Sequence, residues 1–148
     1  MEQRKTVTIV KMRNLIFLLL ALVAAQFWLG MTINLEVNLP VKNLGALQSL
    51  IYFGSHFGFI LAHIINGIAI LVTSLAFLVL SFKTHFLSLK VCAIVVLAGV
   101  IDAIINGMLF LMSGQFFGWS IGMAMDAVSV LIVSAVAMYF IGKNLQTG

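Results

Sequence analysis

Four long apolar stretches, separated by short polar segments, dominate the pattern of hydrophobic and polar positions along the chain. The hydrocarbon core of a bilayer is about 30 Å thick, so a helix needs about 20 consecutive apolar residues to cross it. The stretches that meet this requirement are residues 14–35, 54–82, 88–112 and 119–141. The pattern therefore predicts an all-α integral membrane protein, a four-transmembrane-helix bundle that forms a single membrane domain over residues 1–148.

The first stretch follows a basic N-terminus that contains Arg4, Lys5, Lys11 and Arg13. A basic segment, an apolar run and the small residues of 23–25 are also the features of a cleaved secretory signal peptide, which is the alternative interpretation. Because the hydrophobicity continues for several residues beyond these small residues, the sequence favours an uncleaved membrane anchor.

The connection between the first two spans, residues 36–53, differs in its pattern. From Thr32 to Pro40 apolar and polar residues alternate, a period of two that predicts an extended segment with one buried face. Residues 45–52 then predict a short helix lying in the membrane interface, with Tyr52 near the head groups. This connection is expected to form an amphipathic outer loop.

The segment between Lys42 and Lys83 contains 40 residues without Asp, Glu, Lys or Arg. One helix of that length would extend about 60 Å, roughly twice the bilayer core. The chain must therefore bend, and we expect the bend before Gly54. A long, tilted second span over 54–82 would carry His56 and His63 on one helix face, seven residues apart.

Composition agrees with a membrane location. Hydrophobic residues make up 63% of the chain and charged residues 8%, and the mean hydropathy is +1.21, whereas soluble domains contain about 25% charged residues. The net charge of +4 is concentrated near the ends of the spans. Nucleic acid is excluded as a partner because no basic patch interleaved with aromatic residues occurs, and the lipid bilayer is the expected partner.

The distribution of basic residues predicts the orientation of the bundle. With both termini in the cytoplasm, seven of the eight Lys and Arg residues lie on the inner side and Lys42 alone lies outside. Cytoplasmic loops carry such an excess. The expected location is a multi-pass protein of the cell membrane, most simply the plasma membrane of a prokaryote.

Several polar side chains interrupt the predicted spans at similar depth. These residues are Gln26, His63, Asn66, Asp102, Asn106 and Asp126. An ionisable group at the centre of a membrane helix costs about 2.5–3.5 kcal/mol on insertion scales, so such groups usually face the bundle interior. We therefore expect these residues to form one buried polar cluster in the middle or outer half of the bundle.

The four-residue sequence Ile-Ile-Asn-Gly occurs twice, at 64–67 and 104–107, on helices that cross in opposite directions. Inverted repeats of this kind build many transporters, so internal duplication is one explanation. The other is that Asn-Gly twice provides a hydrogen-bonding position where helices pack closely.

Haem b is one candidate cofactor, bound by His63 and, in a second half-site, by His56. The two histidines would lie about 10 Å apart along one helix, so they cannot ligate the same iron. The axial partner would have to be a methionine such as Met108, Met123 or Met125, or a histidine of a second copy. The architecture resembles four-helix membrane cytochromes and half-size haem A synthases, but the histidine and acidic signatures of that synthase are absent.

A proton or ion carrier that uses Asp102 and Asp126 is a second alternative, because intramembrane acids often mark such paths. No strong metal-binding spacing occurs, so no metal site is predicted. The only cysteine, Cys92, is expected to be a small buried hydrophobic residue that forms no intrachain disulfide.

The third interpretation is structural: the buried amides and acids only hydrogen-bond between helices, in an accessory subunit of a larger membrane complex, redox or respiratory in type. This accessory subunit and a haem-binding or quinol-facing redox protein are the two leading functional hypotheses. Because 148 residues form a thin bundle, each active interpretation implies a homo-oligomer or a larger complex, and the sequence does not decide whether the protein is an enzyme.

Overall fold

The computed structural model describes residues 2–36, 44–113 and 115–146, and nearly all of them are helical. The helices are α1 (Glu2–Glu36), α2 (Ala46–His56), α3 (Gly58–Phe82), α4 (Leu87–Met112) and α5 (Phe117–Gln146). Four of these, α1, α3, α4 and α5, are long and apolar enough to cross a membrane. The predicted all-α bundle with four spans is confirmed, and the chain is a small multi-pass membrane protein.

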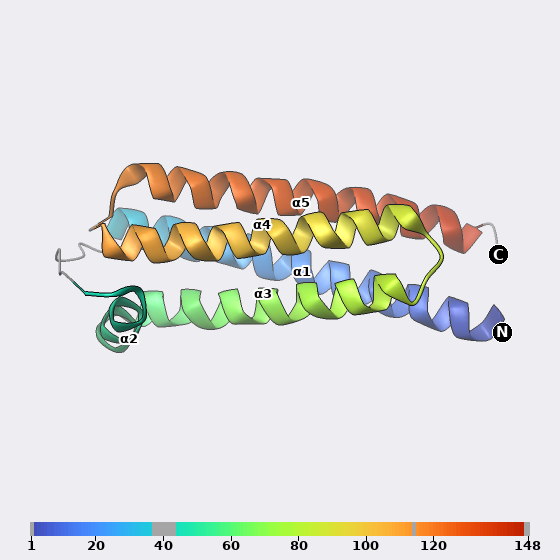
Figure 1. The fold of residues 1–148 in the computed structure, drawn as a ribbon, viewed down its shortest axis with the longest axis horizontal. Helices are drawn as coiled ribbons and strands as arrows, with labels where there is room; N and C mark the ends of the chain where they lie inside the picture. Colours follow the sequence, from blue (N-terminus) through green and yellow to red (C-terminus); the bar gives the residue numbers. More distant parts are fainter. Residues whose placement is uncertain (1, 37–43, 114, 147–148) are drawn as a thin grey trace.

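The four long helices form an antiparallel bundle in which each helix packs against two others. Helix α1 lies beside α3 and α5, and α4 lies beside the same two helices. Both chain termini and the α3–α4 connection share one end of the bundle, while α2 and the α4–α5 connection lie at the other (Figure 1). We call the end with α2 the outer end, following the predicted orientation.

The surface of the bundle is strongly apolar. Between 17% and 28% of the most apolar stretch of each span is buried within the chain, and large side chains such as Val72, Ile132 and Tyr139 are exposed. Several small hydroxyl residues, in contrast, are buried; Thr73 and Ser74 are two of them, and they donate to carbonyls of their own helix at 2.7 and 2.8 Å. Large apolar residues outside and small residues at helix contacts are the arrangement that lipid favours.

The first helix is longer than its predicted span. Residues 32–36, which were expected to be extended, continue α1 as helix, and Thr32 Oγ1 donates to the Trp28 carbonyl one turn earlier at 3.1 Å. The prediction was wrong because the helical conformation places Ile33 in the outer core beside Phe53 and Ile60, and the alternating pattern carries no information about that contact. The rest of the predicted extended segment, 37–40, lies outside the described residues.

The expected short helix after the first span is confirmed as α2, Ala46–His56, and it runs across the outer end of the bundle (Figure 1). Its buried side, which includes Ser49, Phe53 and Gly54, packs against α3 and α4. The chain bends at Phe57, whose backbone is extended at φ −130° and ψ 105°. The second span therefore begins at Gly58 and not at residue 54.

This bend separates the two histidines that the sequence placed on one helix. His56 ends α2, and His63 lies in the second turn of α3. The break is favoured by glycines on both sides, Gly54 and Gly58, because glycine is a weak helix former. The third and fourth spans agree with prediction, with α5 extending beyond both predicted ends.

Candidate functional site

A cavity of about 600 Å³ lies between the four long helices in the outer half of the bundle. This volume is within the range of about 300–1,000 Å³ that is typical of small-molecule sites. Most of its lining side chains are aliphatic or aromatic, and α2 contributes Leu50. The polar residues of the lining are Gln26, Asn34, His63, Ser120 and Asp126. The cavity is therefore an apolar chamber with a few polar positions.

His63 is the central polar group of the wall formed by α1 and α3. Its imidazole lies against Gly30 of α1, where a Cβ would stand 3.3 Å from the ring Cε1. The Nδ1 atom is buried, and neither ring nitrogen has a hydrogen-bond partner among the described residues. A buried polar atom without a partner costs about 1–3 kcal/mol, so His63 is an exception to normal polar packing that requires an explanation.

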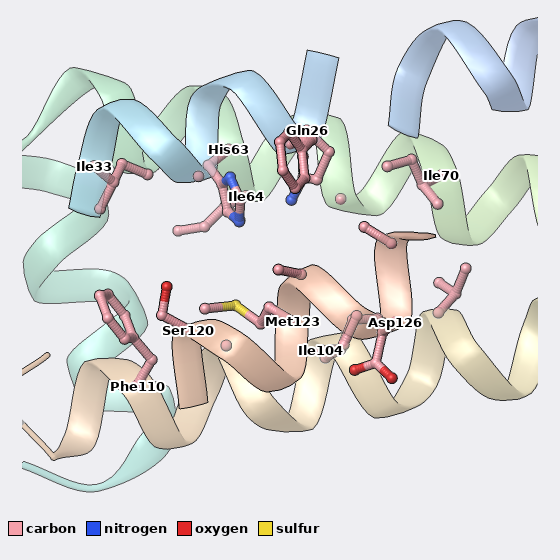
Figure 2. A pocket seen from close by; sticks show the side chains of 18 of the residues that line it. Gln26, Ile33, His63, Ile64, Ile70, Ile104, Phe110, Ser120, Met123 and Asp126 are labelled. Carbon is pink, nitrogen blue, oxygen red and sulfur yellow. The ribbon is translucent and has the colours of Figure 1, made fainter. Parts of the chain in front are cut away.

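Gln26 and Asn66 hold this wall together. The Asn66 amide donates to Gln26 Oε1 at 2.7 Å and to the Leu22 carbonyl at 2.9 Å, which joins α3 to α1. Gly67 lies beside this pair, and a Cβ there would be in ordinary van der Waals contact with Gln26 Nε2, at 3.4 Å. Since Gln26 Oε1 faces Asn66, the amide nitrogen is left to point into the cavity (Figure 2).

The opposite wall is formed by α4 and α5. Figure 2 shows the Ser120 hydroxyl pointing toward the wall that carries His63 and Gln26, and the Met123 side chain lying along the cavity between the two walls. Ser120 was not singled out by sequence reasoning, because a lone serine in an apolar helix carries no signal of its orientation. Met123 was one of three methionines considered as haem ligands; Met125, in contrast, is 65% exposed on the bundle surface.

Asp126 lines the cavity, but its carboxyl group points away from the cavity interior (Figure 2). Its Oδ2 atom accepts a hydrogen bond from the Asn106 amide at 2.9 Å, and its carboxyl group also interacts with that of Asp102. Gly122 makes this packing possible, because a Cβ there would be 3.0 Å from Asn106 Nδ2. The three side chains form a polar group at the α4–α5 contact.

Asp102 differs from the expectation that intramembrane acids face the bundle interior. It is exposed, and it does not line the cavity. Gly99 and Gly107 of α4 pack closely against α5, since a Cβ would lie 3.0 Å from Val130 at the first position and 3.3 Å from the Met123 sulfur at the second. Because α4 turns these glycines toward α5, Asp102 lies beside the α4–α5 contact and faces away from the bundle.

The structure thus divides the expected polar cluster into two groups. Gln26, Asn66 and His63 belong to α1 and α3, and Asp102, Asn106 and Asp126 belong to α4 and α5. Asn66 bonds to a helix that precedes its own, whereas Asn106 bonds to a helix that follows. Duplication of a two-helix unit would place the second Asn-Gly on α5, so the arrangement favours two independent close-packing positions over an inverted repeat.

His56 lies outside the cavity, at the end of α2. Its Nδ1 is 2.7 Å from the Tyr52 carbonyl, and its ring stacks on Tyr52 with 4.3 Å between centroids. Because a carbonyl only accepts, Nδ1 carries the proton in this contact. His56 and His63 are therefore not two ligands of one site.

No group of three or more His, Cys, Asp or Glu side chains that could hold a metal ion occurs in the part of the chain that the structure describes. Cys92 is buried and forms no disulfide. Comparisons of this chain with protein-family models, curated proteins and solved structures gave no significant match.

Proposed function

We propose that the protein binds a lipophilic ring compound with carbonyl or hydroxyl oxygens, a quinone or quinol, in the cavity between its four spans. The observation that carries this proposal is His63: a buried imidazole without a hydrogen-bond partner, on the wall of an apolar cavity. A quinone carbonyl accepts a hydrogen bond from such a ring, and a quinol hydroxyl can donate one. The protein would then act as a quinol-facing member of a membrane redox system.

The other polar groups of the cavity suit a ligand with two oxygen-bearing edges. Gln26 offers an amide donor beside His63, and Ser120 offers a hydroxyl on the opposite wall (Figure 2). Apolar side chains from all four spans fill the remaining surface of the cavity, which suits a ring and an isoprenoid tail. A ligand site is usually an apolar cavity on which a small number of polar groups converge.

Haem b is the second candidate for the same cavity. His63 and Met123 project from opposite walls (Figure 2), and a His–Met pair is a known axial ligand set. The quinone is favoured because a planar macrocycle with two axial bonds needs both ligands at fixed distances on one axis, whereas a quinone needs only hydrogen-bond donors. A carrier that uses Asp126 is less favoured, because its carboxyl group is directed away from the cavity.

The test is to measure what the purified protein retains. Protein extracted in mild detergent from a quinone-containing membrane is expected to hold about one quinone per chain, detected by solvent extraction and by the absorbance change on reduction. His63→Ala and Ser120→Ala should lose most of it. His56→Ala is the matched control, because it removes the same side chain outside the cavity, and it should retain the quinone.

Two results would contradict the proposal. A Soret band in the oxidised and reduced spectra that is lost in both His63→Ala and Met123→Leu would assign the cavity to haem. Equal quinone retention in His63→Ala and His56→Ala would show that the quinone is carried by the detergent–lipid phase and not by this site.

A further inference from the structure

Asp102 lies on a face of α4 that no other part of the described chain covers. The exposed residues of this face follow each other at helical spacing; they are Val91, Ile94, Val95, Ala98, Ile101, Asp102 and Ile105. Asp102 is the only ionisable group among them. It lies ten residues before the end of α4 at Met112, about 15 Å along the helix axis, which is close to the middle of a bilayer core of about 30 Å.

The neighbours of Asp102 within the chain do not satisfy it. The group with which it interacts is the Asp126 carboxyl, and this carboxyl already accepts the Asn106 amide. The Asn106 amide thus serves Asp126, and no amide, hydroxyl or cation among the described residues donates to Asp102. The basic residues whose positions the structure describes, such as Lys83, Lys90 and Lys143, lie at or near the inner end of the bundle, so none can reach Asp102.

We propose that this face of α4 is a docking surface for a transmembrane helix of another protein that carries a lysine or arginine at the middle of the membrane. Charge complementarity decides the occupant: acids within membranes pair with opposite charges, and the one amide donor of the local group, Asn106, is used by Asp126. Ala98, one turn from Asp102 on the same face, allows the partner's backbone to approach closely.

A second copy of this chain is a poorer occupant. Near the depth of Asp102, α5 exposes one polar side chain, Ser129, to a neighbouring copy. Its hydroxyl already donates to the Met125 carbonyl at 2.8 Å. A symmetric contact through this face would therefore bring acid toward acid and supply no cation. Repulsion between like charges disfavours such a pair in a medium of low dielectric constant.

The experiment measures association with model transmembrane peptides. The purified protein is placed in phosphatidylcholine vesicles with a labelled polyleucine helix that has either lysine or leucine at its centre, and binding is followed by energy transfer. The lysine peptide is expected to bind about three- to tenfold more tightly than the leucine peptide. Asp102→Leu should remove this preference, and Asp102→Asn should reduce it.

Matched variants and self-association provide the controls. Val72→Ala changes a lipid-facing residue of α3 that is 60% exposed, and it should keep the lysine preference. Equal binding of the two peptides, or a preference that survives Asp102→Leu, would overturn the proposal. Energy transfer between copies of the protein that is lost in Asp102→Leu would also overturn it, because it would identify a second copy as the occupant. Quinone retention, measured on the same samples, reports separately on the cavity.

Discussion

Gly30 of α1 and His63 of α3 are in such close contact that a Cβ at position 30 would lie 3.3 Å from the imidazole Cε1. The absence of a side chain on α1 therefore sets the position of the ring in the cavity. The imidazole is fixed by packing and not by hydrogen bonds, because its buried Nδ1 has no partner. A group held in this way remains available to a ligand.

Gly30→Ala is the first prediction. The added methyl group must push the imidazole by a few tenths of an ångström, and overpacking of this kind costs about 1–3 kcal/mol. We expect quinone affinity to fall about tenfold while the helix content is unchanged. Gly142→Ala is the control, because nothing lies within 4 Å of a Cβ at that position; equal affinity in the two variants would contradict the role of Gly30.

His63→Leu should stabilise the ligand-free protein. Replacing the unpaired imidazole by an apolar side chain removes a desolvation penalty of about 1–3 kcal/mol. Unfolding in mixed micelles measures this gain, and the same variant should lose quinone. Asn66→Leu should have the opposite effect on stability, because its amide donates two hydrogen bonds. Loss of stability in His63→Leu would instead assign the ring a structural role.

Asn66 and Gln26 should be energetically coupled. A double-mutant cycle with alanine at both positions is expected to give a coupling energy of about 0.6 kcal/mol, and no more than about 1.7 kcal/mol. The control cycle pairs Asn66 with Asn106, which belong to separate polar groups, and it should be additive within about 0.5 kcal/mol. Coupling in the control cycle of the same size would mean that the two groups act as one.

Gly122→Ala should reproduce part of the effect of Asn106→Ala. A Cβ at position 122 would stand 3.0 Å from Asn106 Nδ2, so the amide must shift by a few tenths of an ångström, which weakens its hydrogen bond to Asp126. The two substitutions combined should cost little more than Asn106→Ala alone, because both act on the same hydrogen bond. Gly142→Ala, with nothing within 4 Å, should be neutral. Thermal unfolding in detergent measures all four variants, and additive losses would contradict this interpretation.

The predicted orientation can be tested with introduced cysteines. In a Cys92→Ala background, Gln48→Cys on α2 should react with a membrane-impermeant maleimide in intact cells. Lys143→Cys near the end of α5 should react only after permeabilisation, because the excess of basic residues keeps this end in the cytoplasm. The reverse pattern would invert the bundle but would leave its fold unchanged.

The four spans were predictable because length and hydropathy alone define them, and the predicted ends of the third span agree closely with α4. The rotation of each helix about its own axis could not be predicted. A helix that is apolar on all sides has no polar face to fix its orientation, so the outward position of Asp102 and the inward position of Ser120 depend on packing. The glycine contacts of α4 with α5 determine that packing, and a single sequence does not reveal them.

The break at Phe57 escaped prediction for a different reason. The segment around His56 is apolar on both sides of the break, so hydropathy continues through it. What stops the helix is the contact of Phe53 and Gly54 with α3 and α4, which requires α2 to turn across the bundle. The two histidines, which the sequence placed on one face, were separated by this turn, and the candidate site was reduced to His63.

The two termini share one end of the bundle (Figure 1), and this makes the stoichiometry of any assembly accessible to genetic engineering. A soluble linker can join the C-terminus of one copy to the N-terminus of the next without crossing the bilayer. In such a concatemer one unit can carry Asp102→Leu while the other stays native. Comparing the concatemers would count how many acidic faces each partner helix requires.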